Sequence, residues 1–167
     1  MKRFYAALGV AATIAGLGTA LFAAEAGSAS AGAGTTVTGT VQITNVETLS
    51  ARPAGGNLIL EVRYQGFKSG LWDWQVTGTM VIHPNGTADS HAHGTFSGPA
   101  GDCGDVNGTF EITGKWTVNP DGSLAGGTFH AHSIDESTNP GGFRFNEVAS
   151  IDGSTGNGPY TITYACR

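Results

Sequence analysis

The fold of this chain is decided by residues 71–97, whose sequence is LWDWQVTGTMVIHPNGTADSHAHGTFS. In the first half, large apolar side chains alternate with polar ones, which is the period-two pattern of a strand with one buried face. The triplet Pro84-Asn85-Gly86 then combines residues that favour tight turns. Alternation resumes after the turn with small apolar residues between Thr87 and Ser97. The stretch therefore predicts a β-hairpin of an antiparallel sheet.

The same pattern of alternation and turn residues recurs along the rest of the chain, and no helical periodicity follows residue 34. We expect eight strands, at about residues 35–47, 57–65, 71–83, 87–97, 106–118, 123–134, 143–151 and 159–166. Short connections favour an all-β antiparallel meander that closes, wholly or in part, into a β-barrel, because closure removes exposed strand edges. A two-sheet β-sandwich is the alternative for the same strands.

The first 31 residues have the features of a secretory signal peptide. Lys2 and Arg3 precede an uncharged stretch rich in Ala, Gly and Leu, and both Ala24-Glu25-Ala26 and Ala29-Ser30-Ala31 fit a small-residue cleavage site. We therefore expect residues 1–31 to be removed and residues 32–167 to form a single barrel-like domain. Such a domain is secreted or lies on the exterior of the cell envelope, without a membrane anchor after cleavage.

Charge and cysteine content restrict the partners and the compartment further. The formal net charge is −5, and no run of Lys or Arg occurs, so the chain lacks the basic surface that binds nucleic acid or anionic lipid. The two cysteines, Cys103 and Cys166, lie in the exported part, where thiols are oxidised. We expect one Cys103–Cys166 disulfide, which closes a loop of about 60 residues and stabilises the fold by roughly 3–4 kcal/mol.

Two His-Ala-His triplets, at residues 91–93 and 130–132, are the constellation that suggests chemistry. In a strand, both histidines of such a triplet point to one side of the sheet. The strand expected between the two triplets turns Phe110 and Ile112 toward the core, so Glu111 points outward with the histidines. This pattern predicts a site for one divalent transition ion (Zn, Cu, Ni or non-haem Fe). Its ligands are His91, His93, Glu111, His130 and His132.

Two carboxylates near these triplets, Asp89 and Glu136, are candidates to orient the imidazole rings through their free N–H groups. The alternative interpretation is that the histidines are solvated polar residues on the outside of the sheet. His83, beside Pro84, is interpreted as an ordinary residue at the edge of a turn.

Two further classes of function stay open. Small inward residues such as Ala92 and Ala131 face Trp72, Trp74 and Trp116, and this arrangement gives either a solid core or a cavity for a small apolar ligand. A structural or interaction protein of the cell surface, with a protein partner of unspecified kind, is the third class. No nucleophile elbow, phosphate-binding loop or zincin motif occurs, so the sequence favours a non-enzymatic binding protein.

Overall fold

The computed structural model describes residues 34–134 and 142–166. Eight strands and one short 3₁₀ helix make up this part of the chain: β1 (Thr35–Ala54), β2 (Asn57–Lys68), β3 (Asp73–Ile82), β4 (Thr87–Pro99), η1 (Gly101–Cys103), β5 (Asp105–Val118), β6 (Leu124–Ser133), β7 (Arg144–Asp152) and β8 (Asn157–Ala165). The signal peptide expected at residues 1–31 lies outside the described residues. In the described part, no helix has the length and apolar character needed to cross a membrane.

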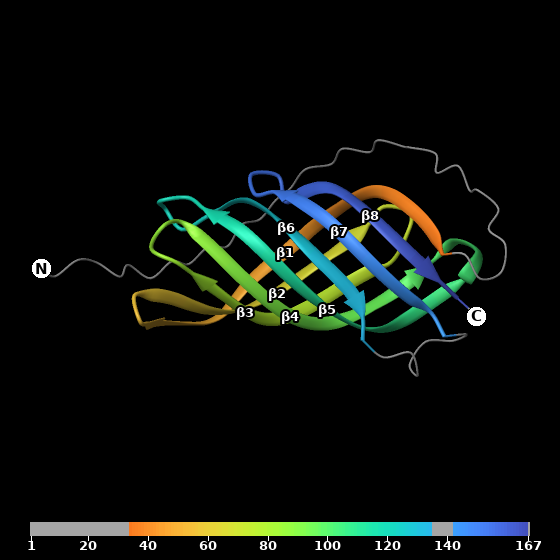
Figure 1. Cartoon of the computed structure of the whole chain (residues 1–167), viewed down its shortest axis with the longest axis horizontal. Helices are drawn as coiled ribbons and strands as arrows, with labels where there is room; N and C mark the ends of the chain where they lie inside the picture. Colours follow the sequence, from red (N-terminus) through yellow and green to blue (C-terminus); the bar gives the residue numbers. More distant parts are fainter. Residues whose placement is uncertain (1–33, 135–141, 167) are drawn as a thin grey trace, which may run out of the picture.

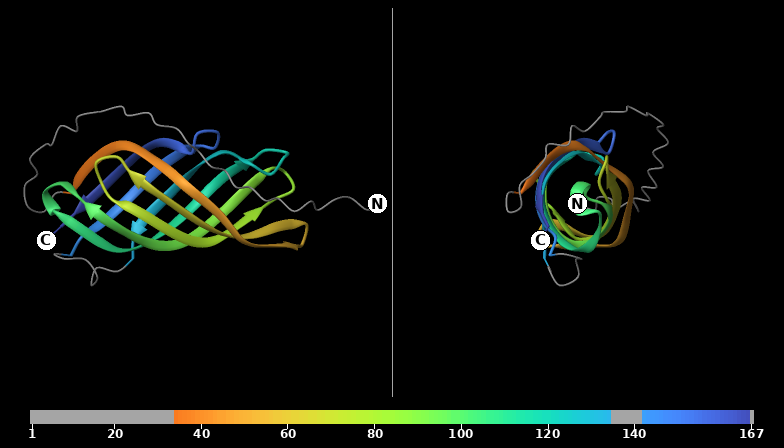
Figure 2. Two further views of the ribbon diagram at one scale, coloured as in Figure 1. Left: turned by 180° about the vertical axis from the view of Figure 1, so that it is seen from behind. Right: turned by 90° about the vertical axis from the view of Figure 1, so that its right-hand side faces the viewer.

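The strands form a closed antiparallel meander, in which each strand pairs with the next and β8 returns to pair with β1. Figure 1 shows the strands running obliquely along the molecule, and the end-on view in Figure 2 shows the ring that they make. The barrel expected from the alternation is confirmed, and the sandwich alternative does not form. All eight expected strands are present, with ends that differ by a few residues except in β1.

The ring is uneven at β1, which is longer than the strand expected from the sequence. β1 pairs with β8 only from Thr35 to Gln42, whereas its pairing with β2 continues as far as Ala54. Two register shifts interrupt the β1–β2 ladder, the first of them at Thr44. A bulge of this kind bends its strand and increases the local twist. The second half of β1 therefore leaves the line of the ring and keeps one edge unpaired among the described residues.

The core fills the barrel with side chains from alternate positions of every strand. The most deeply buried large residues are Trp72, Tyr160, Phe96, Phe110, Phe143, Phe145, Ile162, Val41, Val76 and Val106. Five of these rings pack together near η1, with centroid separations of 5.2 Å for Trp72–Phe96 and 5.2 Å for Trp72–Phe145. Offset and edge contacts between rings add to the free energy gained by burying apolar area.

Small inward residues in the other half of the barrel make room for one large ring. A Cβ atom added to Gly127 would lie 2.5 Å from the ring of Trp116, and one added to Gly114 would lie 2.6 Å from Trp116 Nε1. The same indole N–H donates a hydrogen bond to Ser90 Oγ at 2.7 Å. Small and large side chains therefore interdigitate here, which favours a packed core over a cavity in this region.

The expected disulfide joins Cys103 of η1 to Cys166, which follows β8, with a Cα–Cα distance of 5.9 Å. The bond links the connection between β4 and β5 to the end of the last strand, which Figure 1 shows at the same end of the barrel. Residues from opposite parts of the ring are thereby held together next to the aromatic cluster.

Candidate functional site

Strand register brings the predicted metal ligands together on the outside of the barrel. His93 of β4 lies directly opposite Glu111 of β5, and Glu111 lies directly opposite His132 of β6. His91 and His130 lie opposite Thr113, one row further along the same three strands. All four histidines are exposed, because their alanine neighbours and the large residues of β5 face the core. The expectation that both triplets flank β5 and point to one side is confirmed.

Glu111 is the centre of this cluster, which we call the histidine face (His91, His93, Glu111, His130 and His132). His91 Nε2 donates a hydrogen bond to Glu111 Oε1. On the other side, His132 Nε2 lies 4.0 Å from Glu111 Oε2. The His93 ring packs edge-on against the His91 ring, with centroids 4.7 Å apart. Two imidazoles from different strands therefore flank one carboxylate, one at each oxygen.

The imidazoles hold the pKa of Glu111 below its ordinary value of 4.5. The largest cause is the hydrogen bond from His91, and the positive charges of His91, His93 and His132 act in the same direction. The carboxylate is consequently ionised over a wide range of pH. An ionised carboxylate beside imidazole nitrogens is a donor set typical of sites for borderline transition ions.

In the arrangement observed, the rings of His91 and His132 approach the Glu111 carboxylate instead of converging on a common point. Among residues 34–134 and 142–166, no group of three or more His, Cys, Asp or Glu side chains is placed to hold a metal ion. The side chains of His91 and His132 are 52% and 53% exposed, so solvent surrounds half of each ring. Rotation of exposed side chains is required before three of these groups can share one ion.

Asp89, expected to orient a ring of the histidine face, contacts other partners instead. Asp89 accepts hydrogen bonds from Lys115 and from His83 Nε2, the latter at 2.9 Å. Both contacts lower the pKa of Asp89, with the Lys115 bond as the larger cause. His83 also contacts Asn57 through Nδ1 at 3.2 Å, so it joins β2 to β4 beyond the turn-edge role expected. Glu136 lies outside the described residues.

A buried ion pair inside the barrel was missed by the sequence reasoning. Lys68 Nζ lies 3.2 Å from Glu147 Oε2, and the two side chains are 2% and 0% exposed. The rings of Trp72, Trp74 and Phe110 surround the ammonium group, with centroids at 5.6, 5.5 and 5.9 Å. Apart from Lys68, neither oxygen of Glu147 has a hydrogen-bond partner among the described residues. The pair is thus held by charge and by the aromatic faces rather than by a hydrogen-bond network.

Burial dominates the titration of both partners of this pair. It lowers the pKa of Lys68 and raises the pKa of Glu147, and in each case the charge of the other partner opposes the shift without cancelling it. The signal that could have revealed Glu147 is its position in the alternation of β7, between the inward residues Phe145 and Ala149. Lys68 continues the inward series of Tyr64 and Gly66 in β2 in the same way.

Comparison with known proteins adds no assignment to this site. The chain matches no protein-family model, and a search of curated proteins finds no relative. The class that the fold and its surface define is a closed eight-stranded antiparallel barrel with a cluster of histidines around one carboxylate on its outer wall.

Proposed function

We propose that the chain is a secreted, non-enzymatic binding protein that takes up one divalent transition ion at the histidine face. The observation that carries the proposal is the position of the Glu111 carboxylate between the Nε2 atoms of His91 and His132. Rings that already approach a common carboxylate from two strands need only side-chain rotation to share an ion with it. Because the barrel fixes the backbone of all three strands, the donors stay within reach of one another.

The donor set restricts the ions. One carboxylate and two or more imidazoles suit Zn(II), Cu(II), Ni(II) or non-haem iron, whereas calcium and magnesium prefer sites made entirely of oxygen. Three protein ligands leave a coordination position to water. The site lies on an exposed wall of the barrel, without the enclosed and water-excluding surroundings that favour catalysis, and so binding is proposed without turnover.

Calorimetric titration of metal-free chain with ZnCl₂ and CuCl₂ at pH 7.5 tests the proposal. We expect one ion per chain, and a loss of at least tenfold in affinity in the His91→Ala/His132→Ala variant. Affinity falls in acid, because imidazole must be deprotonated to bind a metal. His83→Ala is the matched control, since it removes a histidine bound to Asp89 and leaves the histidine face intact. Equal heats from the wild type and the double variant would overturn the proposal.

Metal analysis of chain purified without an affinity tag is the second measurement. We expect a stoichiometric content of one transition metal that dialysis against a chelator removes. If the His91→Ala/His132→Ala variant retains the same metal content, the ion is bound elsewhere, and the assignment to the histidine face is contradicted.

A further inference from the structure

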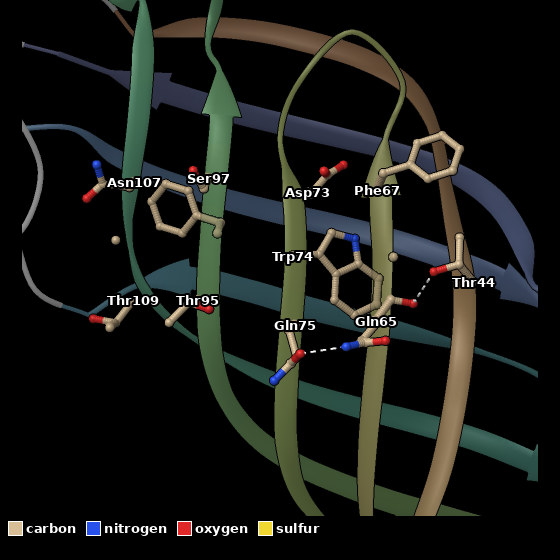
Figure 3. A pocket seen from close by; sticks show the side chains of 13 residues that line it. Thr44, Gln65, Phe67, Asp73, Trp74, Gln75, Thr95, Ser97, Asn107 and Thr109 are labelled. Carbon is tan, nitrogen blue, oxygen red and sulfur yellow. Dashed lines mark hydrogen bonds between the residues drawn. The ribbon is translucent and has the colours of Figure 1, made fainter.

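An open groove of about 770 Å³ lies on the outer wall of β2–β5, beside the bulge of β1 (Figure 3). It is separate from the histidine face, and none of the predicted metal ligands lines it. We call it the transverse groove, because it crosses four strands rather than running along one. Its volume is within the range typical of ligand sites in proteins.

Two parallel rows of outward side chains form its sides. The first row crosses the sheet as Gln65, Gln75, Thr95 and Thr109, which are paired strand by strand. The second row crosses in the same way as Phe67, Asp73, Ser97 and Asn107. Members of the two rows are two residues apart on each strand, so the rows are separated by about 7 Å.

The floor between the rows is backbone, because the intervening residues face inward. Trp74 and Phe96 occupy the middle of this inward row, and Gly66 lies at its β1 side. A Cβ atom on Gly66 would lie 2.5 Å from the Trp74 ring, so the indole fills the space beneath the glycine. The floor of the groove is therefore a single layer of backbone, and the Trp74 ring packs directly beneath it.

Hydrogen bonds link two members of the first row to each other and to β1 before any ligand arrives. Asn45 Nδ2 donates to Gln65 Oε1 at 3.4 Å, and Gln65 Nε2 donates to Gln75 Oε1 at 2.6 Å. At the bulge, Thr44 Oγ1 donates to the backbone carbonyl of Gln65 at 3.2 Å, as Figure 3 shows. This ladder orients the two amide side chains of the first row, Gln65 and Gln75, which lowers the entropic cost of binding to them.

The groove is nearly neutral and has one aromatic ring at its side. Asp73 is the single charged side chain among the described residues that line it. The lining therefore offers no cation for a phosphate, a sulfate or a nucleic acid. Phe67, at 38% exposed, is one of few large apolar side chains that the barrel presents to solvent. An exposed ring beside amides and hydroxyls fits a ligand with both C–H faces and many hydroxyl groups.

We propose that the transverse groove binds an extended, uncharged β-1,4-linked glycan. Amide and hydroxyl side chains both donate and accept hydrogen bonds, as sugar hydroxyls do. Each residue of such a glycan advances along its chain by nearly the separation of neighbouring strands, about 4.8 Å. Successive sugars therefore meet successive strands, with one member of each row beside every sugar, and the sugar at the β2 end stacks on Phe67.

An extended peptide fits the transverse groove less well. The backbone N–H and C=O groups of its floor already pair within the β2–β5 ladders, so a chain crossing the strands gains no backbone hydrogen bonds from them. The side chains of the groove are the contacts that remain for a ligand. Their hydrogen-bonding groups match the hydroxyl groups of a sugar more closely than the N–H and C=O groups of a peptide.

Calorimetry with cellohexaose, chitohexaose and maltohexaose as the probes tests the proposal. We expect saturable binding of cellohexaose or chitohexaose, and at least tenfold weaker binding of maltohexaose, whose α-linkages curve the chain away from a straight groove. Phe67→Ala and Gln75→Ala are expected to weaken binding of the favoured hexaose at least fivefold. Circular dichroism and the urea midpoint verify that each variant is folded.

Two controls separate this site from the rest of the surface. Val148→Ala removes another exposed apolar side chain, 51% exposed on β7, and is expected to leave glycan affinity unchanged. His91→Ala/His132→Ala is expected to leave the glycan affinity unchanged as well. The glycan proposal and the metal proposal are therefore tested independently of each other. The proposal is overturned if no β-linked hexaose binds, if maltohexaose binds equally well, or if binding persists in both groove variants.

Discussion

Replacement of the buried pair by apolar side chains is expected to stabilise the barrel. Lys68 and Glu147 are 2% and 0% exposed, and burial outweighs their mutual attraction in shifting both pKa values. Buried pairs of this kind are often matched or exceeded by well-packed apolar residues, by about 1–4 kcal/mol. We expect Lys68→Met/Glu147→Leu to raise the free energy of unfolding at pH 7 by an amount in that range.

Removal of the lysine alone has the opposite effect. In Lys68→Met, the carboxyl of Glu147 is left among aromatic rings without a counter-charge, and it stays protonated to well above its ordinary pKa of 4.5. Removing one partner of a buried pair typically costs about 3–5 kcal/mol, so Lys68→Met is expected to be less stable than the double variant by an amount of that order. We therefore expect the order of stability at pH 7 to be double variant, wild type and single variant.

The sign of the pH dependence provides a second test of the same reasoning. A carboxyl whose pKa is raised on folding contributes its full share of stability below pH 4.5, and this share is lost as the pH rises through the raised pKa. The deficit of Lys68→Met against the double variant is therefore small at pH 4 and grows toward pH 7.

Urea unfolding followed by tryptophan fluorescence, repeated from pH 4 to pH 8, measures all three proteins. Arg63→Met is the matched control, because it breaks the Arg63–Glu47 pair, whose side chains are 38% and 49% exposed. Its effect is expected to stay below about 1 kcal/mol. A Lys68→Met variant that equals the wild type at every pH would refute the reasoning that burial penalises an unpaired Glu147.

Three further predictions concern the disulfide and the packing of the core. Loss of the bond in Cys103→Ala/Cys166→Ala is expected to lower the free energy of unfolding by about 4 kcal/mol for a loop of this length, and a loss under 1 kcal/mol by urea unfolding would contradict it. Gly78→Ala is expected to destabilise by about 1–3 kcal/mol, because its Cβ would lie 2.1 Å from a backbone oxygen of β4; an unchanged thermal midpoint would show that the strands can separate there. Ser90→Ala leaves the buried Trp116 N–H without its acceptor, and the expected cost is about 1–3 kcal/mol; a neutral result would mean that water replaces the hydroxyl.

The strands and turns could be predicted because each is encoded locally. In β5, Phe110, Ile112 and Trp116 alternate with polar residues, and the expected start of the strand differs from the observed one by a single residue. The histidine face followed from the same alternation, since the inward residues of β5 fix the outward ones on its neighbours. Two cysteines leave one pairing, and the structure contains it.

Features that depend on distant strands could not be predicted in the same way. The second half of β1 shows no clear alternation, and its pairing with β2 across the hairpin is what extends the strand to Ala54. Strict alternation with Gly127 and Phe129 would turn Ala125 toward the core, but the register shift between Thr117 and Val118 leaves it exposed. Lys68 and Glu147 are far apart in the chain, so alternation within one strand does not indicate that they form a pair. Charged residues are also rarely buried, so their inward positions did not stand out as a sign of an ion pair.

Because β1 pairs with β8, every strand of the ring has a paired neighbour on each side, and the order of pairing does not depend on where the chain begins. Thr35 lies opposite Tyr164, so the two ends of the described barrel are neighbours. A circularly permuted chain, opened at the Gly55-Gly56 turn and joined by a short linker between these ends, would retain the pairing of all eight strands. In the natural order, the seam between β1 and β8 joins residues more than a hundred positions apart, so loop-closure entropy makes it the slowest ladder to form during folding.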